Sequence, residues 1–458
     1  MALEVQVIES SFVVPSAGMP RRGLWVSSLD LDRANRGYTP TVYFYHRSTD
    51  AAAAGNVSDA TSRLKDSMAN ALVLFYPLAG RLGVDKDGRI EIDCNSEGAL
   101  FVIARSELTM DDLKNLEPSP ELTRLFVPRI PSTDEQPSSI ILAVQVTLLK
   151  CGGMSLGTAL HHVAVDGTSA FHFFQTWSTI SRDGDGAAVE PPCHDRTLLR
   201  ARRPPSVHPD ALSVFCPKMS FAEPSGPTAS KVFVVSADQL ASLKRASGSE
   251  TTFCALTALV WQCTCVARRL PPAAEARVSF SANIRRSTRP PLPTRYFGNA
   301  LVPVFAAGAA GDVASDALES VAGRIRRAIS RVDDELVRSA VDYHELFGID
   351  YRLQRGILPA TELRMVSWLG MPLYDADFGW GRPWRARAPH EQRPGAGQWR
   401  PRPRVLGGCT YGGVRATALC KARRLAFSFL CVSCHQSKSK FGVGIFNCIH
   451  VLFLEQLQ

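Results

Sequence analysis

The chain has 458 residues, 45% of them hydrophobic and 21% charged, so it is long enough to bury a large core and to form two domains. Its net charge of +9 on its own suggests an anionic partner. The excess positive charge lies in residues 382–458, however, which hold 13 Lys and Arg against two Glu. The remaining body is near neutral, which argues against the clustered basic face of a nucleic-acid-binding protein.

Targeting and membrane segments are not evident in the composition. The first 27 residues mix Glu, Ser, Pro and Arg without an apolar signal core, so we expect the twelve cysteines in a reducing cytosol. The longest apolar stretches, 425–434 and 441–454, are short or interrupted by polar residues. Neither supplies the roughly 20 apolar residues of a membrane span, and we expect none.

Strand-like and helical patterns alternate through the first part of the chain. Runs at 41–45, 89–93 and 101–104 have the short, apolar character of strands. Leu64, Met68 and Leu72 recur at the four-residue spacing of a helix. The patterns predict an α/β chain.

A hairpin is predicted between residues 140 and 160, where two apolar segments flank Gly152 and Gly153. It delivers the chain to the stretch LHHVAVDG, residues 160–167. Thr168 is then a candidate N-cap of a helix. A strand, a sharp turn and a helix leave reactive side chains exposed while both elements hold them in place.

The same helix presents Ala170, Phe174 and Trp177 on one face. Residues 182–230 are rich in Pro, Gly, Ser and charge, which is typical of a crossover between domains.

We therefore place one domain at 1–185, a linker at 186–230, a second domain at 231–383 and a basic tail at 384–458. The second domain begins with a predicted strand at 231–235 and continues with helical patterns at 252–267 and 313–330.

His162 and Asp166 have the spacing of a general base and an orienting carboxylate, but so do His46 and Asp50. A chain of this composition is expected to contain about half of one such pair by accident. Context favours His162, which lies between an apolar strand and an amphipathic helix. The alternative is a core histidine satisfied by hydrogen bonds. His161 is expected to be structural, because neighbours at a strand end point to opposite faces.

A second motif, DFGWG at residues 377–381, is expected by chance on the order of 10⁻⁴ times in a chain of this length. Alone it predicts a turn with a packed tryptophan.

Together, HHVAVDG and DFGWG resemble the two signatures of the plant BAHD acyl-CoA-dependent acyltransferases, in the right order and about 200 residues apart. The similarity is closest to the hydroxycinnamoyltransferase branch and runs from residue 5 to about 383, through YTPTVYFY, FYPLAGRL, GRIEIDCN, KCGG, DRTLLRAR, YFGN, DDELVRSAVDY and YDADFGWG. The resemblance implies two similar mixed-sheet α/β domains of the chloramphenicol-acetyltransferase type. It also implies a central channel that CoA enters from one face and the acceptor from the other.

The resemblance assigns the catalytic residues. His162 would be the general base, because a neutral imidazole can take the proton of the acceptor as it attacks the thioester. Asp166, next to Gly167, would pair with Arg285 of the other domain and act architecturally. Asp377 is a second catalytic candidate, although we favour a structural part for it beside Trp380.

The substrate-binding residues follow from the same resemblance. Thr39 matches a threonine that donates to the oxyanion, and Tyr43 matches a tyrosine of the acceptor site. The positions that line the CoA and acyl pocket are Thr252, Arg285, Ser367 and Trp368. Core packing is the alternative for Tyr43 and Trp368. No metal or redox cofactor is implied, because the thioester already activates the acyl group, and CoA is a co-substrate.

The sequence departs from the family at the acceptor site. Shikimate-using relatives carry an arginine where this chain has Gly370, and a threonine where it has Val366. An acidic acceptor therefore lacks its charged anchor. We expect an amine acceptor such as tryptamine, tyramine or putrescine, with O-acylation of shikimate, quinate or another alcohol as the alternative.

The second departure is the tail. No motif of the family is evident after residue 383, and five of the twelve cysteines lie in the last fifty residues. A shifted reading frame would explain this composition, and translating the coding DNA in the other two frames tests it. The chain is thus expected to be a monomeric cytosolic acyltransferase that binds an acyl-CoA and a small acceptor, neither nucleic acid nor membrane. The alternative of another class is a catalytically dead, frame-shifted or truncated product.

Overall fold

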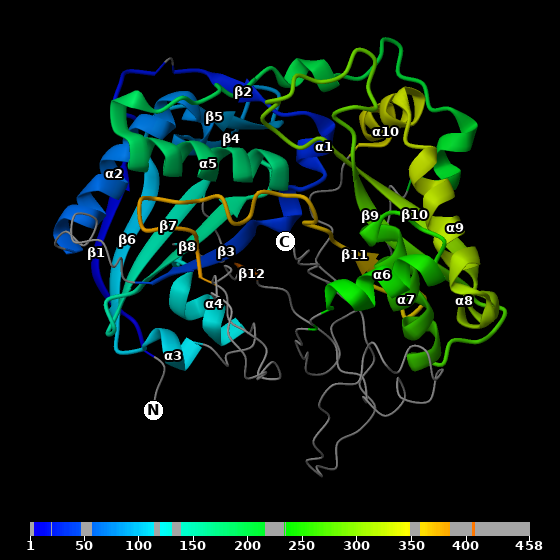
Figure 1. Cartoon of the computed structure of the whole chain (residues 1–458). Coiled ribbons are helices and arrows are strands. Elements are labelled where there is room, and N and C mark those ends of the chain that lie inside the picture. The colour runs from blue at the N-terminus through cyan, green and yellow to red at the C-terminus, as the bar shows by residue number, and fades with distance from the viewer. Residues whose placement is uncertain are drawn as a thin grey trace. The chain divides into compact units, whose positions relative to one another are not determined.

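The computed structural model describes residues 4–19, 21–46, 57–113, 120–130, 139–215, 233, 235–348, 358–384 and 405–407. The chain forms two compact units (Figure 1). The first contains Met1–Arg200, Pro293–Asn299 and Met371–Gly408, and the second contains Ala201–Leu292, Ala300–Gly370 and Cys409–Gln458. Both combine helices with a sheet, so the predicted mixed α/β class is confirmed.

The first unit is built on a six-stranded mixed sheet. Its strands, in spatial order, are β1 (Gln6–Val13), β6 (Ala99–Ser106), β7 (Leu142–Leu149), β8 (Met154–His161), β3 (Tyr38–Tyr45) and β12 (Val405–Gly407). All neighbours are antiparallel except β6 and β7. A smaller antiparallel sheet holds β2 (Gly23–Trp25), β5 (Ile90–Asp93) and β4 (Arg81–Val84). The strands predicted at 41–45, 89–93 and 101–104 are confirmed.

The predicted glycine hairpin joins β7 to β8. The Leu149 backbone N–H donates to the Gly153 carbonyl at 2.9 Å. Gly152 has a φ of +79°, in the region that favours glycine. A Cβ on Gly153 would lie 2.9 Å from the Tyr45 carbonyl oxygen, so the turn approaches β3 more closely than a side chain allows.

Helices α2 (Val57–Leu74) and α5 (Gly167–Asp183) lie against one face of this sheet (Figure 1). Leu64, Met68 and Leu72 of α2 are fully buried, as their spacing predicts. The predicted cap of α5 at Thr168 is wrong. Asp166 is the N-cap, because its backbone is extended and its carboxylate accepts from the Ser169 N–H at 3.0 Å.

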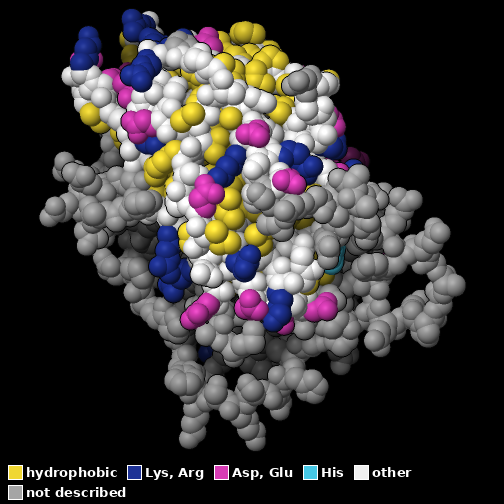
Figure 2. All heavy atoms as spheres, turned by 90° about the vertical axis from the view of Figure 1, so that its left-hand side faces the viewer, with side chains coloured by type: hydrophobic (Ala, Val, Ile, Leu, Met, Phe, Trp, Pro, Cys, Tyr) yellow, Lys and Arg dark blue, Asp and Glu magenta, His cyan; other side chains and the backbone are white. Residues whose placement is uncertain are grey.

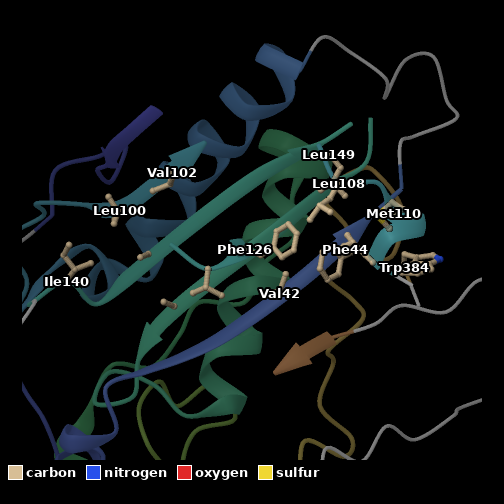
Figure 3. Packing of buried hydrophobic residues seen from close by; sticks show 14 residues of the cluster. Val42, Phe44, Leu100, Val102, Leu108, Met110, Phe126, Ile140, Leu149 and Trp384 are labelled. Carbon is tan, nitrogen blue, oxygen red and sulfur yellow. The ribbon is translucent and has the colours of Figure 1, made fainter. Parts of the chain in front are cut away.

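The opposite face of the sheet covers a second apolar core, shown in Figure 3. Val42 and Phe44 of β3 alternate with Tyr43 and Tyr45, so the two pairs point to opposite faces. The Phe44 ring meets Phe126 edge to face, with centroids 5.3 Å apart. Helices α3 (Met110–Leu113) and α4 (Pro120–Phe126) contribute to this core.

Shorter elements complete the first unit. They are α1 (Ser28–Leu31) and the 3₁₀ turns η1 (Ala34–Arg36), η2 (Tyr76–Ala79), η3 (Gly184–Gly186) and η4 (Arg196–Leu199).

The second unit has a three-stranded sheet in which β9 (Glu275–Asn283) pairs antiparallel with β10 (Leu301–Ala309) and parallel with β11 (Glu362–Met365). Its helical elements are η5 (Pro209–Ser213), α6 (Ala237–Ala246), α7 (Thr252–Ala267), α8 (Ala310–Ser315), α9 (Leu318–Ser330) and α10 (Asp334–Phe347). Helix α7 has the predicted bounds.

Two other predictions for the second unit need correction or lie outside the described residues. The helix predicted at 313–330 is divided into α8 and α9, because the non-helical backbone of Asp316 ends the first helix and Ala317 is the N-cap of the second. The predicted strand at 231–235 is described only at Phe233 and Val235, and neither residue belongs to a strand.

The boundaries predicted for the domains differ in part from the compact units. The change of unit after Arg200 falls inside the predicted linker. DFGWG follows the second unit in the sequence but belongs to the first, because its aromatic rings pack on β3 and α5. Of the predicted tail, Trp384 is buried in the core of Figure 3 and residues 405–407 pair with β3. The remainder lies outside the described residues.

The surface that carries β1 and α2 mixes charges of both signs with apolar side chains (Figure 2). Among the exposed residues of β1 are Val7, Ile8 and Phe12, and Glu9 forms an ion pair with Lys65 of α2. Among the helices that the structure describes, none has the length and apolar character needed to cross a membrane.

Candidate active site

His161 and His162 stand where β8 ends beside the start of β3. Tyr38 is opposite His161 in the ladder, and the His162 backbone N–H donates to the Gly37 carbonyl at 2.8 Å. The His161 ring meets the Tyr38 ring edge to face, with centroids 5.0 Å apart. Because successive residues point to opposite faces, His162 is placed on the side of β3 that carries Thr39 and Tyr43.

The surroundings of His162 keep its imidazole neutral. Burial, followed by the positive charges of Arg36 and Arg33, lowers the pKa of His162 to about 3, against a weaker opposing effect of Asp166. Nδ1 is buried and has no hydrogen-bond partner among the described residues, while the ring as a whole keeps some exposure to solvent. A neutral imidazole is the form that accepts a proton, and it is the form present at neutral pH, although the lowered pKa also makes His162 a weaker base than an ordinary histidine.

We expect His162 to remain neutral in the folded protein well below the ordinary histidine pKa of 6.5. Because the folded-state pKa is lowered, the contribution of His162 to stability is complete above pH 6.5 and is lost as the pH falls toward 3. NMR of the protein labelled with ¹³C-histidine measures this, with His162→Gln to assign the signal. The His162 shift should stay constant from pH 8 to about 5, and a midpoint near 6.5 would contradict the expectation.

Asp166 and Gly167 fix the beginning of α5. The Asp166 carboxylate is buried and caps the helix through the Ser169 N–H. A Cβ on Gly167 would lie 3.0 Å from the Met371 sulfur, so the backbone there approaches a neighbouring side chain closely. The pairing of Asp166 with Arg285 that the family resemblance implies stays a prediction.

Asp377 binds the backbone of its own loop. Its Oδ1 accepts from the N–H groups of Gly379 and Gly381, both at 2.9 Å. These glycines have φ angles of +94° and +83°, which turn their amides back toward the carboxylate at no steric cost. The arrangement resembles an Asx-type turn, in which a carboxylate stabilises a loop.

The aromatic residues of DFGWG anchor this loop to the first unit. Phe378 is fully buried and meets Trp177 of α5 edge to face, with centroids 4.8 Å apart. Trp380 lies 5.5 Å from the Tyr45 ring, and the Tyr45 hydroxyl donates to the Ala376 carbonyl at 2.8 Å. The motif therefore packs against β3 and α5.

We predict that Asp377 has a structural role, which Asp377→Asn and Asp377→Ala separate from a catalytic one. The asparagine keeps an oxygen acceptor for the two glycine amides but is not a base, so kcat should stay within about threefold of the wild type. The alanine should lower the free energy of unfolding by about 1–3 kcal/mol, because it leaves those amides without their charged partner. Denaturant unfolding and initial rates measure both, and a hundredfold loss of kcat in Asp377→Asn would instead identify a base.

Thr39 and Tyr43 lie on the same face of β3. Thr39 is opposite Leu160 and half-buried. Tyr43 is fully buried against Phe174, with ring centroids 6.0 Å apart, and its hydroxyl has no partner among the described residues. Burial and Tyr374 raise the pKa of Tyr43, so its hydroxyl stays protonated. The packing fits a core role, and the unpaired hydroxyl fits a role in binding.

The remaining predicted residues belong to the second unit. Thr252 is buried at the start of α7, after the N-cap Thr251. Arg285 is buried just after β9, and its backbone N–H donates to Asn283 Oδ1 at 3.1 Å. Ser367 and Trp368 are half-buried beyond β11, and Ser367 Oγ accepts from the Leu369 N–H at 3.2 Å. Their part in CoA binding stays a prediction.

Gly370 follows the segment of Ser367 and Trp368. It has a φ of +71°, and a Cβ built there would meet no heavy atom within 4 Å. The backbone therefore favours glycine, although space for a larger side chain is present. Within the described part of the chain, no group of three or more His, Cys, Asp or Glu is arranged to hold a metal ion.

Three buried polar residues next to His162 were missed by the sequence analysis. They are Asp30, Arg196 and Asn299, which all belong to the first unit. Arg196 and Asn299 lie in DRTLLRAR and YFGN, two motifs noted above for their resemblance without a role. YFGN offered a usable signal, an amide residue at the end of an otherwise apolar motif, whereas Arg196 is one of three arginines in DRTLLRAR and could not be singled out.

Known proteins similar to this chain cover most of its length. A family model described as the Transferase family matches residues 3–403, beyond residue 383 where the motif resemblance stops. Putrescine hydroxycinnamoyltransferase 1 of Oryza sativa subsp. japonica is 43% identical over 406 residues, which cover 83% of this chain and 88% of that protein. Shikimate O-hydroxycinnamoyltransferase of Nicotiana tabacum is 38% identical over 397 residues, covering 83% and 89%. Among solved structures, vinorine synthase has the same fold, with a TM-score of 0.64 at 24% identity over 83% of this chain and 87% of that one.

Proposed function

Because the chain belongs to the BAHD family of acyl-CoA-dependent acyltransferases, we propose that it transfers a hydroxycinnamoyl or related aromatic acyl group from CoA to an amine, with His162 as the general base. The observation that carries the choice of an amine is Gly370, which by the family resemblance takes the position of an arginine in shikimate-using members. The similarity to a putrescine transferase supports the same choice. The proposal includes a monomeric enzyme of the cytosol.

In the proposed reaction the amine nitrogen attacks the thioester carbonyl carbon while His162 takes a proton from that nitrogen. The tetrahedral intermediate then expels the CoA sulfur, the C–S bond breaks, and the imidazolium returns the proton to the departing thiolate. The products are an amide and free CoA. Thr39 is proposed to donate to the oxyanion, since donors aimed at developing charge stabilise such intermediates.

A second candidate function is O-acylation of an acidic alcohol such as shikimate. Arg36 places positive charge close enough to His162 to lower its pKa, and such charge would also attract a carboxylate, whereas Arg33 is buried and paired with Asp32. The similarity to the tobacco shikimate transferase supports this candidate. Both functions use the same base and donor, so the acceptor alone distinguishes them.

The test is release of free thiol from p-coumaroyl-CoA, with putrescine, tyramine, tryptamine, shikimate and quinate offered in turn. We expect the highest kcat/KM with an amine. A higher value with shikimate than with every amine would assign the second function. Folded protein that consumes no acceptor would instead support a non-catalytic product of an altered reading frame.

A further inference from the structure

Asp30, Arg196 and Asn299 meet inside the first unit although 269 positions separate the first from the last. Asp30 lies in α1, Arg196 begins η4, and Asn299 ends the segment Pro293–Asn299. Asp30 and Asn299 are 0% exposed and Arg196 is 1% exposed. A buried cluster of this kind is expensive to desolvate, so each member needs compensating partners.

The Asp30 carboxylate has such partners on both oxygens. Oδ1 accepts from the Asn299 backbone N–H at 2.7 Å and from Asn299 Nδ2 at 3.0 Å. Oδ2 accepts from the backbone N–H and the hydroxyl of Ser27, each at 2.8 Å, and lies 3.2 Å from Arg196 Nη1. The carboxylate thereby fixes the orientation of both the guanidinium and the amide.

The guanidinium and the amide then hold the backbone that follows β8. Asn299 Nδ2 donates to the His162 carbonyl at 2.8 Å and lies 3.3 Å from the Val163 carbonyl. Arg196 Nη1 donates to the Val163 carbonyl at 3.3 Å, and Nη2 donates to the Ala164 carbonyl at 2.7 Å. Three successive carbonyls, beginning with that of His162, are held by two side chains.

All the partners of Asn299 Nδ2 are oxygens, so the amide must present its NH₂ group to them. The planar guanidinium of Arg196 presents several N–H donors in a fixed fork and can bond two neighbouring carbonyls at once. The ammonium of lysine is a point charge without this fixed geometry. The geometry thus depends on the identity of these side chains as well as on their polarity.

We propose that Asp30, Arg196 and Asn299 are positioning residues that hold the His162 backbone, and so aim its imidazole at the acceptor. The inference rests on the proposed role of His162 as base. None of the hydrogen bonds described for these three side chains reaches the imidazole. Arg196 and Asn299 act through the main chain, and Asp30 acts through them. A displacement of about 1 Å at a reacting group is enough to cost roughly a hundredfold in rate.

The primary test uses Asn299→Ala and Arg196→Lys. Each should lower kcat about 10- to 100-fold, because the His162 imidazole is no longer oriented toward the acceptor. KM for p-coumaroyl-CoA should stay within about threefold, because substrate binding is retained. Arg196→Lys keeps the positive charge beside Asp30, so this variant should fold and allow the test even if Asn299→Ala does not fold. In both variants the His162 NMR signal should titrate closer to pH 6.5 than in the wild type, since a released segment admits solvent.

Asp342→Asn is the matched control. Asp342 is 0% exposed and accepts from the Arg202 N–H at 2.8 Å, Arg202 Nε at 2.6 Å and the Ser206 N–H at 2.9 Å. These partners leave the His162 backbone untouched. Asp342→Asn should lower the unfolding temperature by a similar amount to Asn299→Ala, yet keep the kcat of the wild type at a temperature where both are folded.

The outcomes separate the inference from the function on which it rests. If His162→Ala is inactive while Asn299→Ala and Arg196→Lys keep full kcat, positioning is wrong and the base stands. An equal loss of kcat in Asp342→Asn would also overturn positioning, since it would reflect general destabilisation. Full activity in His162→Ala would remove the base itself.

Discussion

Replacement of His162 by alanine is expected to lower kcat by about 10²- to 10⁴-fold, the usual contribution of a positioned general base. The thioester remains activated and the remaining binding residues stay in place, so a residual rate should persist. KM for the acyl-CoA should change little, because the imidazole takes part in proton transfer rather than in holding the substrate. Initial rates of thiol release with the preferred acceptor at pH 7.5 measure both constants.

His172→Gln is the matched control for this prediction. His172 is a buried histidine of α5 in the first unit, and its Nε2 bonds the Glu190 carbonyl at 3.0 Å. Its loss should affect stability and leave kcat near that of the wild type. Equal losses in His162→Ala and His172→Gln would show that removing a buried imidazole, rather than a base, slows the enzyme.

Much of the frame around His162 could be predicted from local patterns. A short apolar run identified β3, and a glycine pair between apolar segments identified the β7–β8 hairpin that ends at His161. Both signals depend on residues that are neighbours in the sequence, so they can be recognised without a structure. The cap of α5 was misplaced by two residues, because Asp166 was interpreted as a partner of His162 or Arg285 and not as a capping side chain.

Contacts between distant segments could not be predicted in the same way. The Asp30 carboxylate bonds Asn299 across most of the chain, and periodicity carries no information about such pairs. DFGWG likewise belongs to the first unit because Phe378 and Trp380 find their aromatic partners there, although the chain reaches it after the second. The family resemblance assigned roles to residues that are distant in the sequence, such as His162 and Asp377, which local patterns could not do. It assigned no role to Asp30, Arg196 or Asn299.

Gly370→Arg is expected to raise the ratio of kcat/KM for shikimate to that for putrescine about 10- to 100-fold. A charge-assisted hydrogen bond to a carboxylate is worth about 1.5–3 kcal/mol, and each 1.4 kcal/mol corresponds to about tenfold. Position 370 has room for a side chain, since a Cβ there meets no heavy atom within 4 Å. The same charge should disfavour a cationic amine, so the two rates should move in opposite directions.

The backbone at Gly370 requires its own control, because its φ of +71° makes any other residue strained by about 1–2 kcal/mol. Gly370→Ala carries this strain without the charge, so it should lower the free energy of unfolding as Gly370→Arg does but leave the acceptor ratio unchanged. Gly370→Lys adds a point charge without the planar fork and should give a smaller shift than arginine. If alanine moved the ratio as far as arginine, loop conformation rather than a missing anchor would set the acceptor, and the argument for an amine from Gly370 would fail.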